Sequence, residues 1–383
     1  MTKVAFVLTQ DRGGPVDVTV ALAAELVTRG VKVAVFGPAP ANPAAVVGLR
    51  HVPVAVGSKL DVDAMIRLAA QLRSWEPDVT HAQDRRAALA IASPGLARGL
   101  GATVWTYHGV PYDVSQQWFS GTTRSRAPSR YSRAVLTADA LVARRMRRVI
   151  APSLPMQRFL RGRLRVPAIA VAHIPNGVSL PDAEVLSGPV RRLVFIGGLE
   201  PVKGVLDLLA ALSRPGVFPP DATLDIIGDG PERQRAMVAA ARPPLAGKVR
   251  FLGFRPAAAD LLAGYDALVM ASRIEQQPLV VVQAMAAGRL VLATRVGDIP
   301  DMVDIDGFPS FLAPPGDTDA LAAELTRLFS VSDPFEASRR LAARARERYS
   351  AARSADAHLT LYHSLTAVGT GHSDCRAVRP DEL

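Results

Sequence analysis

The sequence contains a single cysteine, Cys375, among its 383 residues, and aromatic residues make up 5% of it. One cysteine cannot form a disulfide within the chain, which favours a reducing compartment. No apolar run approaches the roughly 20 residues that a membrane-spanning helix requires. The apolar stretch at residues 4–8 is too short for the core of a signal peptide. We therefore expect a cytoplasmic protein.

Two catalytic patterns are also missing. The sequence offers no convincing nucleophile with a paired base, and no Asp-x-Asp stands at the end of a predicted strand. The first pattern would indicate covalent catalysis and the second a bound metal ion. We therefore expect no metal site and no other cofactor.

Acidic residues are scarce between Arg124 and Arg148, where eight arginines accompany one acid, Asp139, in a chain of net charge +10. This segment is typical of a helix with a solvated basic face. It could also attract a nucleotide diphosphate, an acidic acceptor or a membrane surface, which would be a peripheral contact. Nucleic acid is not expected as a partner, because no recognition motif accompanies the arginines.

What the chain does contain is a repeated alternation of short apolar strands with amphipathic helical segments. This alternation predicts parallel sheets with helices on both faces. The expected strands are 4–9, 32–36, 78–82, 103–107, 148–152 and 170–175, then 193–196, 223–227, 249–252, 267–271 and 290–294. We expect domains at 1–178 and 179–366, with the last helix able to return to the first domain, and a disordered tail at 367–383.

The stretch from 272 to 288 organises the second domain. It follows the expected strand 267–271, and Pro278 and Gly288 fit the start and the end of a helix. Glu275, Gln276 and Gln277 therefore lie on a strand-to-helix loop. The free N–H groups and the positive end of a helix favour phosphate at such a loop.

This stretch resembles the retaining GT-B glycosyltransferases of the family-4 type. That family carries a Glu, seven residues, a second Glu, and then Ala-Met-Ala and Gly; Glu275 matches the first Glu, and Gln283 replaces the second. Further stretches match the family in order, after a Gly-Gly at Gly14 and a His-Gly at His108: 197–204, 228–232, 251–253 and 297–301.

The resemblance implies a GT-B fold, in which two Rossmann-like doubly wound parallel-sheet domains face a cleft and Asn176 lies at the crossing between them. It also implies a hexosyltransferase that moves a sugar from a nucleotide-diphosphate sugar, UDP-sugar above all, to a small-molecule acceptor. The anomeric configuration would be retained and no metal would be needed, since the departing phosphate takes the proton of the acceptor.

The resemblance further implies site residues. His108 and Glu275 would lie at the reacting centre, and Lys203 would bind the diphosphate. The family has an Arg where this chain has Gly198, and Arg273 is our candidate for the missing cation. The other expected donor-binding residues are Gly14, Gln276, Gln277, Leu279, Val280, Gln283 and Gly253.

For the acceptor, Asp11, Asp84 and Asp113 each follow an expected strand of the first domain. Acids at one rim of a basic protein suggest a cationic acceptor, such as an aminocyclitol in antibiotic biosynthesis, although Asp is also common in ordinary turns. The arginine segment instead favours an anionic or lipid-linked acceptor. Gly198 and Gln283 leave open a catalytically weak homologue that acts as a partner or regulator, whereas the motif set argues against a sugar-nucleotide epimerase.

Overall fold

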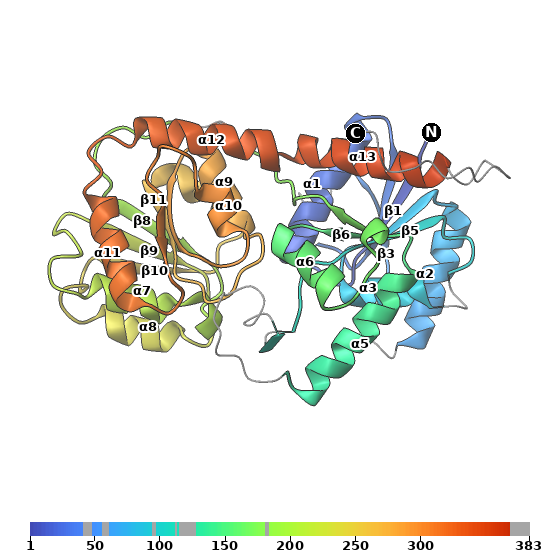
Figure 1. The fold of residues 1–383 in the computed structure, drawn as a ribbon, viewed down its shortest axis with the longest axis horizontal. Coiled ribbons are helices and arrows are strands. Elements are labelled where there is room, and N and C mark those ends of the chain that lie inside the picture. Colours follow the sequence, from blue (N-terminus) through green and yellow to red (C-terminus); the bar gives the residue numbers. More distant parts are fainter. Residues whose placement is uncertain are drawn as a thin grey trace.

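The structure, a computed structural model, describes residues 1–40, 48–55, 61–93, 97–111, 113–114, 128–180 and 184–367. Its N-terminal domain is built on a seven-stranded parallel sheet (Figure 1). The strands are β1 (Lys3–Val7), β2 (Lys32–Gly37), β3 (Arg50–Pro53), β4 (Val79–Ala82), β5 (Ala102–Thr106), β6 (Arg148–Ala151) and β7 (Val171–His173). They lie in the order β3-β2-β1-β4-β5-β6-β7.

Helices cover both faces of this sheet, as the alternation of the sequence predicts. They are α1 (Gly14–Thr28), α2 (Val62–Trp75), α3 (Arg85–Ala92), α5 (Arg130–Arg145) and α6 (Leu154–Gly162). Successive residues of a strand point to opposite faces, so Val4 and Phe6 of β1 pack with α1, while Ala5 and Val7 pack with the other four helices. Both faces of the sheet are therefore buried, which explains the continuously apolar strands.

The C-terminal domain repeats this plan with a six-stranded parallel sheet. Its strands are β8 (Arg192–Ile196), β9 (Thr223–Ile227), β10 (Val249–Gly253), β11 (Ala267–Met270), β12 (Leu290–Thr294) and β13 (Phe311–Ala313), in the order β10-β9-β8-β11-β12-β13. Its helices are α7 (Val205–Leu212), α8 (Arg233–Ala240), α9 (Leu279–Ala286), α10 (Ile299–Val303) and α11 (Thr318–Phe329). The predicted fold, two doubly wound parallel-sheet domains, is confirmed.

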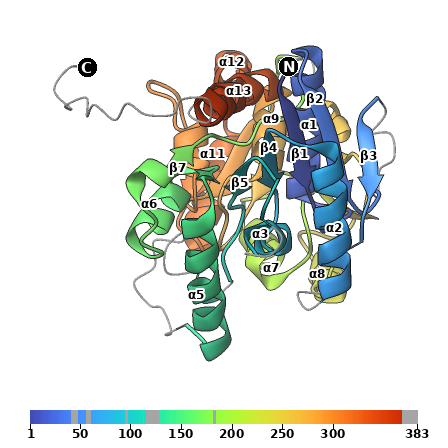
Figure 2. The same ribbon diagram turned by 90° about the vertical axis from the view of Figure 1, so that its right-hand side faces the viewer.

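Two consecutive helices at the end of the described chain join the domains. Helix α12 (Phe335–Tyr349) packs on α9 of the C-terminal domain, and α13 (Ala351–Ala367) packs on α1 of the N-terminal domain (Figure 1). In Figure 2, which looks from the N-terminal domain, α13 lies above the sheet and α3 and α5 lie below it. Tyr362 and Leu365 of α13 belong to the same buried cluster as α1.

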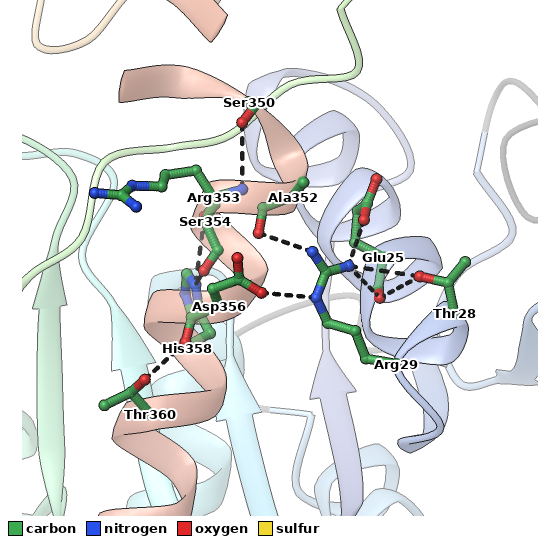
Figure 3. Close-up of polar contacts among 10 residues, drawn as sticks. All are labelled: Glu25, Thr28, Arg29, Ser350, Ala352, Arg353, Ser354, Asp356, His358 and Thr360. Atoms are coloured by element: carbon green, nitrogen blue, oxygen red, sulfur yellow. Dashed lines mark hydrogen bonds and ion pairs between the residues drawn. The ribbon is translucent and has the colours of Figure 1, made fainter. Parts of the chain in front are cut away.

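Polar contacts fix α13 to α1 at its edge (Figure 3). The Arg29 guanidinium, at the end of α1, donates to the Asp356 carboxylate at 2.8 Å and to the Ala352 carbonyl at 3.2 Å. It also pairs with Glu25 one turn earlier on α1. The last described helix is thus part of the N-terminal domain, although it follows the C-terminal one in sequence.

Most of the described arginine segment forms α5, whereas Arg147 follows this helix and Arg148 begins β6. Arg130, Arg133 and Arg144 are exposed on α5, and its buried side carries Val135, Leu136 and other apolar residues. Arg124 and Arg126 lie outside the described residues. The arginines of α5 therefore form the solvated face of an amphipathic helix. None of the helices in the described part of the chain is long and apolar enough to cross a membrane.

Candidate active site

Two of the predicted site residues lie at the point where the strand order of the C-terminal sheet reverses. Strands β8 and β11 are neighbours, but the chain leaves β8 towards β9 on the opposite side. Such a point leaves a crevice at the carboxyl ends of the strands, and ligands of α/β sheets bind there. Lys203 follows β8 and Glu275 follows β11, so the two side chains flank this crevice.

Lys203 and Glu275 form an ion pair, in which the ammonium Nζ donates to the carboxylate Oε1 at 2.7 Å. The Lys203 side chain is 28% exposed and that of Glu275 is 10% exposed. The backbone N–H of Arg273 donates to the Val202 carbonyl at 2.7 Å and ties the two loops together. The structure therefore brings together one cation and one carboxylate that are 72 positions apart in the sequence.

Two glycines allow the loops to approach this closely. Gly204 has φ +67°, and a Cβ there would lie 2.0 Å from the Ala271 carbonyl oxygen. Gly297 has φ +58°, and a Cβ there would lie 2.3 Å from the Glu275 carbonyl oxygen. A side chain at either position would be strained by its backbone conformation and would collide with the neighbouring backbone. The loop that carries Glu275 is therefore fixed from two sides.

Helix α9 turns one face towards the N-terminal domain. The Leu279 Cδ1 atom lies 3.4 Å from the place that a Cβ would take on Gly14, at the start of α1. Gln283 is four residues after Leu279, and residues at this spacing share a face of a helix. Gln283 and Val280 are half-buried, whereas Val281 and Val282 are fully buried in the core. Gln283 therefore lies on the α9 face that is directed towards Gly14.

The two glutamines of the loop have different surroundings. The Gln277 side chain is 6% exposed; its Oε1 accepts from the Asn176 N–H at 2.8 Å, and its Nε2 donates to the Asn176 carbonyl at 3.4 Å. Gln277 thus holds the crossing between the domains, and both polar atoms of its side chain contact Asn176. The Gln276 Oε1 atom is buried and has no hydrogen-bond partner among the described residues, so Gln276 retains an unused acceptor.

Arg273, the candidate for the missing cation, forms a bidentate ion pair with Asp207 of α7, and its shortest contact is 2.9 Å. Its guanidinium would have to leave Asp207 to reach a diphosphate. At Gly198 the nearest heavy atom to a built Cβ is 3.7 Å away, so crowding at the Cβ position does not explain why an Arg is absent. Gly253 ends β10, and the next residue, Phe254, is 69% exposed.

His108 follows β5 of the N-terminal domain, and its ring Nε2 lies 3.0 Å from the side-chain oxygen of Gln83, which follows β4. The imidazole is half-buried. Burial, and then the nearby charge of His358, lower the pKa of His108 to about 4. His108 is therefore neutral at neutral pH, and it can accept as well as donate hydrogen bonds.

The three acids expected at the acceptor rim differ in the hydrogen bonds and ion pairs that their carboxylates already make. Asp84 is 7% exposed and accepts from the Thr9 N–H, the Thr9 hydroxyl and the Ala87 N–H, so it caps α3 and fixes the end of β1. Asp113 accepts from Ser129 and Ser132 at the start of α5, which lowers its pKa. Asp11 pairs with Arg12 and has a side chain that is 44% exposed. The structure thus gives Asp84 and Asp113 structural partners and leaves Asp11 the most accessible.

Asp298 is a residue of this region that the sequence did not single out as functional. It is 4% exposed, and its backbone N–H donates to the Gln276 carbonyl at 2.7 Å. The Leu154 backbone at the start of α6, in the other domain, stabilises its ionised form. Burial, followed by the negative charge of Asp301, raises the pKa of Asp298 to about 7, against opposing effects of Leu154, Arg348 and Arg158.

This pKa predicts a pH dependence of stability. The folded protein holds the Asp298 proton more tightly than the unfolded chain does, whose value is 3.8. The resulting stabilisation is complete below about pH 4 and is lost as the pH rises through 7. Asp298→Asn carries no such proton, so its stability relative to wild type should rise by about 2–4 kcal/mol between pH 4 and pH 8. Melting curves across that range test this, and parallel curves for the two proteins would contradict it.

Gln283→Glu tests the orientation of α9. If Gln283 lies against the ribose of a bound donor, a carboxylate there should keep or improve donor affinity, by up to about tenfold, because charge-assisted hydrogen bonds to hydroxyls are stronger. Calorimetric titration with the nucleotide measures this, with Gln71→Glu on the exposed side of α2 as control. A lowered melting temperature without any change in affinity would instead assign Gln283 to the packing of the helix.

Two family models match the chain. Residues 12–181 match the model described as Glycosyltransferase Family 4, and residues 190–330 match Glycosyl transferases group 1. The chain is 30% identical over 302 residues to a glycogen synthase of Mycobacterium tuberculosis, covering 74% of this chain and 69% of that one. It is 31% identical over 283 residues to a 2-deoxystreptamine N-acetyl-D-glucosaminyltransferase of Streptomyces fradiae, covering 67% and 64%.

Among solved structures, HepE of Anabaena, in complex with UDP and glucose, superposes with a TM-score of 0.76 at 20% identity, over 95% of this chain and 100% of that one. Two parallel-sheet domains joined in this way define a protein of the GT-B class. Given the sequence matches as well, the chain belongs to the group 1, family 4 glycosyltransferases. The predicted GT-B glycosyltransferase family is thereby confirmed, whereas retention at the anomeric carbon stays a prediction.

Proposed function

We propose that this glycosyltransferase moves a sugar from a nucleotide-diphosphate donor, a UDP-sugar, to an acceptor hydroxyl with retention at the anomeric carbon and without a metal ion. The Lys203–Glu275 pair at the reversal point of the sheet carries this proposal. A diphosphate needs a cation, a donor sugar needs a hydrogen-bond acceptor, and the pair holds one of each beside the start of α9.

When the donor binds, Lys203 and Glu275 would separate, and each would bind a different part of the donor. Lys203 turns to the diphosphate, where it stabilises the negative charge that develops as the nucleotide leaves. Glu275 then accepts hydrogen bonds from hydroxyls of the donor sugar and orients its anomeric carbon. The N–H groups of Leu279 and Val280 at the start of α9 face the phosphate oxygens.

In the transfer step, the bond between the anomeric carbon and the phosphate oxygen breaks, and a bond from the acceptor oxygen forms on the same face of the sugar. The acceptor proton passes to the departing phosphate oxygen. Lys203, Glu275 and the start of α9 therefore act by binding and orienting the donor. His108, at the end of β5 and neutral at neutral pH, would contact a hydroxyl close to the reacting carbon.

For the base, the exposed Phe254 ring next to Gly253 offers an apolar surface on which a uracil could stack. UDP as the nucleotide is supported by the structural neighbour, HepE, which has been solved with UDP-glucose.

For the acceptor, we propose an amino-bearing cyclitol. Two relatives support it: the Streptomyces fradiae enzyme, and a 2-deoxystreptamine glucosyltransferase of Streptomyces kanamyceticus that is 32% identical over 177 residues. On this chain, Asp11 remains the accessible acid at the rim. An acceptor ammonium would compete with Arg12 for its carboxylate.

Transfer from UDP-glucose and UDP-N-acetylglucosamine to 2-deoxystreptamine and to its N-acetylated form tests this proposal, in reactions that contain excess chelator. We expect transfer to the free amine, with KM raised about tenfold by acetylation, equivalent to ~1.4 kcal/mol. Asp11→Asn should raise the KM for the free amine and leave the KM for its acetylated form unchanged. Asp63→Asn, at an exposed position of α2, should change neither KM. Equal rates for both acceptors, or a preference for anionic ones, would contradict the proposal of an amino-bearing acceptor. If chelator abolishes activity and added metal restores it, the reaction is not metal-free.

A further inference from the structure

Gln83 connects His108 to the interior of the N-terminal domain. Its side chain is 1% exposed, and its backbone N–H donates to the Val7 carbonyl at 2.9 Å. Its side-chain oxygen lies 3.0 Å from His108 Nε2. In the part of the chain that the structure describes, no second hydrogen bond holds the His108 ring. Gln83 is thus the buried and fixed partner of a half-buried, less constrained imidazole.

We propose that Gln83 is a positioning residue for the transfer reaction: its side-chain oxygen accepts the Nε2 proton of His108, so that Nδ1 is left as an acceptor for a sugar hydroxyl. A carboxamide oxygen accepts hydrogen bonds and cannot donate them, so Nε2 must carry the proton. In a neutral imidazole the other nitrogen is then unprotonated. The proposal deepens the proposed function and rests on its placement of His108.

The groups behind Gln83 are neutral, which favours the neutral form of the His108 imidazole that the proposal requires. Behind Gln83 lies His81, with Nδ1 at 2.7 Å from the Tyr362 hydroxyl and Nε2 at 2.7 Å from the Thr106 hydroxyl. The His358 ring of α13 lies 5.7 Å from the His81 ring. Burial lowers the pKa of His81 and of His358, and it raises that of Tyr362. All of these groups are therefore uncharged near pH 7.

The charged groups beside the His108 loop compensate each other. Arg85, the first residue of α3, donates to the Gly109 carbonyl at 3.0 Å, and its guanidinium also pairs with the buried Asp139 at 2.7 Å. The carboxylate of the neighbouring Asp84 accepts hydrogen bonds from the Thr9 N–H and from the Ala87 N–H at the start of α3. A carboxylate at position 83 would therefore introduce an uncompensated charge next to His108 and would stabilise its protonated form.

The experiment compares wild type with Gln83→Glu, which keeps an accepting oxygen but adds charge, and Gln83→Leu, which removes the acceptor. Gln71→Glu on the exposed side of α2 is the matched control. Long-range ¹H–¹⁵N spectra report the protonated nitrogen and the pKa of each histidine, and His108→Asn assigns the His108 signals. Transfer kinetics from pH 5 to pH 9 accompany the spectra.

We expect wild-type His108 to carry its proton on Nε2. Gln83→Glu should raise the pKa of His108 by about 1–3 units and shift the acidic limb of kcat/KM by the same amount, with activity recovered at high pH. Gln83→Leu should mix the tautomers and lower kcat on the order of 10–100-fold, with the KM of the donor unchanged. The control should match wild type throughout.

A His108 proton on Nδ1 in wild type would overturn the proposal without any variant. So would spectra of His108 that are the same in wild type, Gln83→Glu and Gln83→Leu. The spectra require no turnover: an inactive wild-type enzyme with the expected Nε2 proton would contradict the proposed function, whereas an active one with the wrong tautomer would contradict the role of Gln83.

Discussion

Glu275→Ala is expected to lower kcat/KM for transfer on the order of 10³-fold, while the affinity for UDP is kept or improved. The loss follows from the missing acceptor for donor-sugar hydroxyls. The gain follows from the ion pair, because Lys203 no longer has Glu275 as a partner at 2.7 Å and is free to bind the diphosphate. Turnover and nucleotide binding should therefore change in opposite directions.

Steady-state kinetics and calorimetric titration with UDP measure the two effects. Glu275→Gln, which keeps the shape and the hydrogen-bonding oxygen, should lie between wild type and Glu275→Ala in turnover. Glu324→Ala is the control, since Glu324 pairs with Arg327 on α11. The melting temperature should change little, because Lys203 is 28% exposed and can be solvated. Turnover within a few-fold of wild type would remove Glu275 from the site.

Lys203→Ala is expected to weaken UDP binding about 10–100-fold, which corresponds to the ~1.5–3 kcal/mol of a charge-assisted hydrogen bond. Binding of uridine, which has no phosphate, should be unchanged. Titrations of both ligands measure this, with Lys32→Ala at the exposed start of β2 as control. Equal losses for UDP and uridine would show that Lys203 does not contact the phosphates.

The same variant should also destabilise the protein, since it leaves a carboxylate that is 10% exposed without its cation. The expected cost is on the order of 1–3 kcal/mol of unfolding free energy. The double variant Lys203→Ala with Glu275→Ala should recover most of this loss, because neither charge then remains. Additive losses in the double variant would mean that the ion pair is not formed in solution.

Local pattern predicted most of the fold. The strands β9 and β12 have the bounds that the sequence predicts, and the helical patterns at 85–92 and 318–329 match α3 and α11. Apolar runs and capping residues mark the ends of these elements. The edge strands β3 and β13 were missed; β3 has no fully buried residue and β13 has three residues, so neither shows a pattern long enough to recognise.

The division between α12 and α13 depends on tertiary structure. No Pro or Gly marks it; instead Val178, which lies at the crossing between the domains, accepts from the Ala351 N–H at 2.9 Å and donates to the Tyr349 carbonyl at 3.0 Å. These contacts hold Ser350 in an extended conformation and end the helix there. The helical pattern at 334–349 does predict the end of α12 at Tyr349, but not the second helix, α13, that starts two residues later.

The sequence predicted only part of the candidate site, because some of its contacts join residues that are far apart in the chain. The loop positions of Lys203 and Glu275 follow from the strands before them, and parallel topology brings them together. The roles of Gln277 and Arg273 depend on partners elsewhere, Asn176 and Asp207, that no local pattern specifies. Local pattern places Gln83 only on the loop after the expected strand 78–82, since its contact with His108 requires β4 and β5 to be adjacent.

The central claim, that the crevice beside Lys203 and Glu275 binds a nucleotide diphosphate, is tested most directly by thermal denaturation of the wild-type protein with UDP, GDP, dTDP and ADP. A ligand that binds the folded state alone adds about 2.7 kcal/mol of stability at a hundred times its Kd. We expect UDP to raise the melting temperature in a concentration-dependent way and more than the other nucleotides do. A melting temperature that none of the four changes, up to millimolar concentrations, would contradict it.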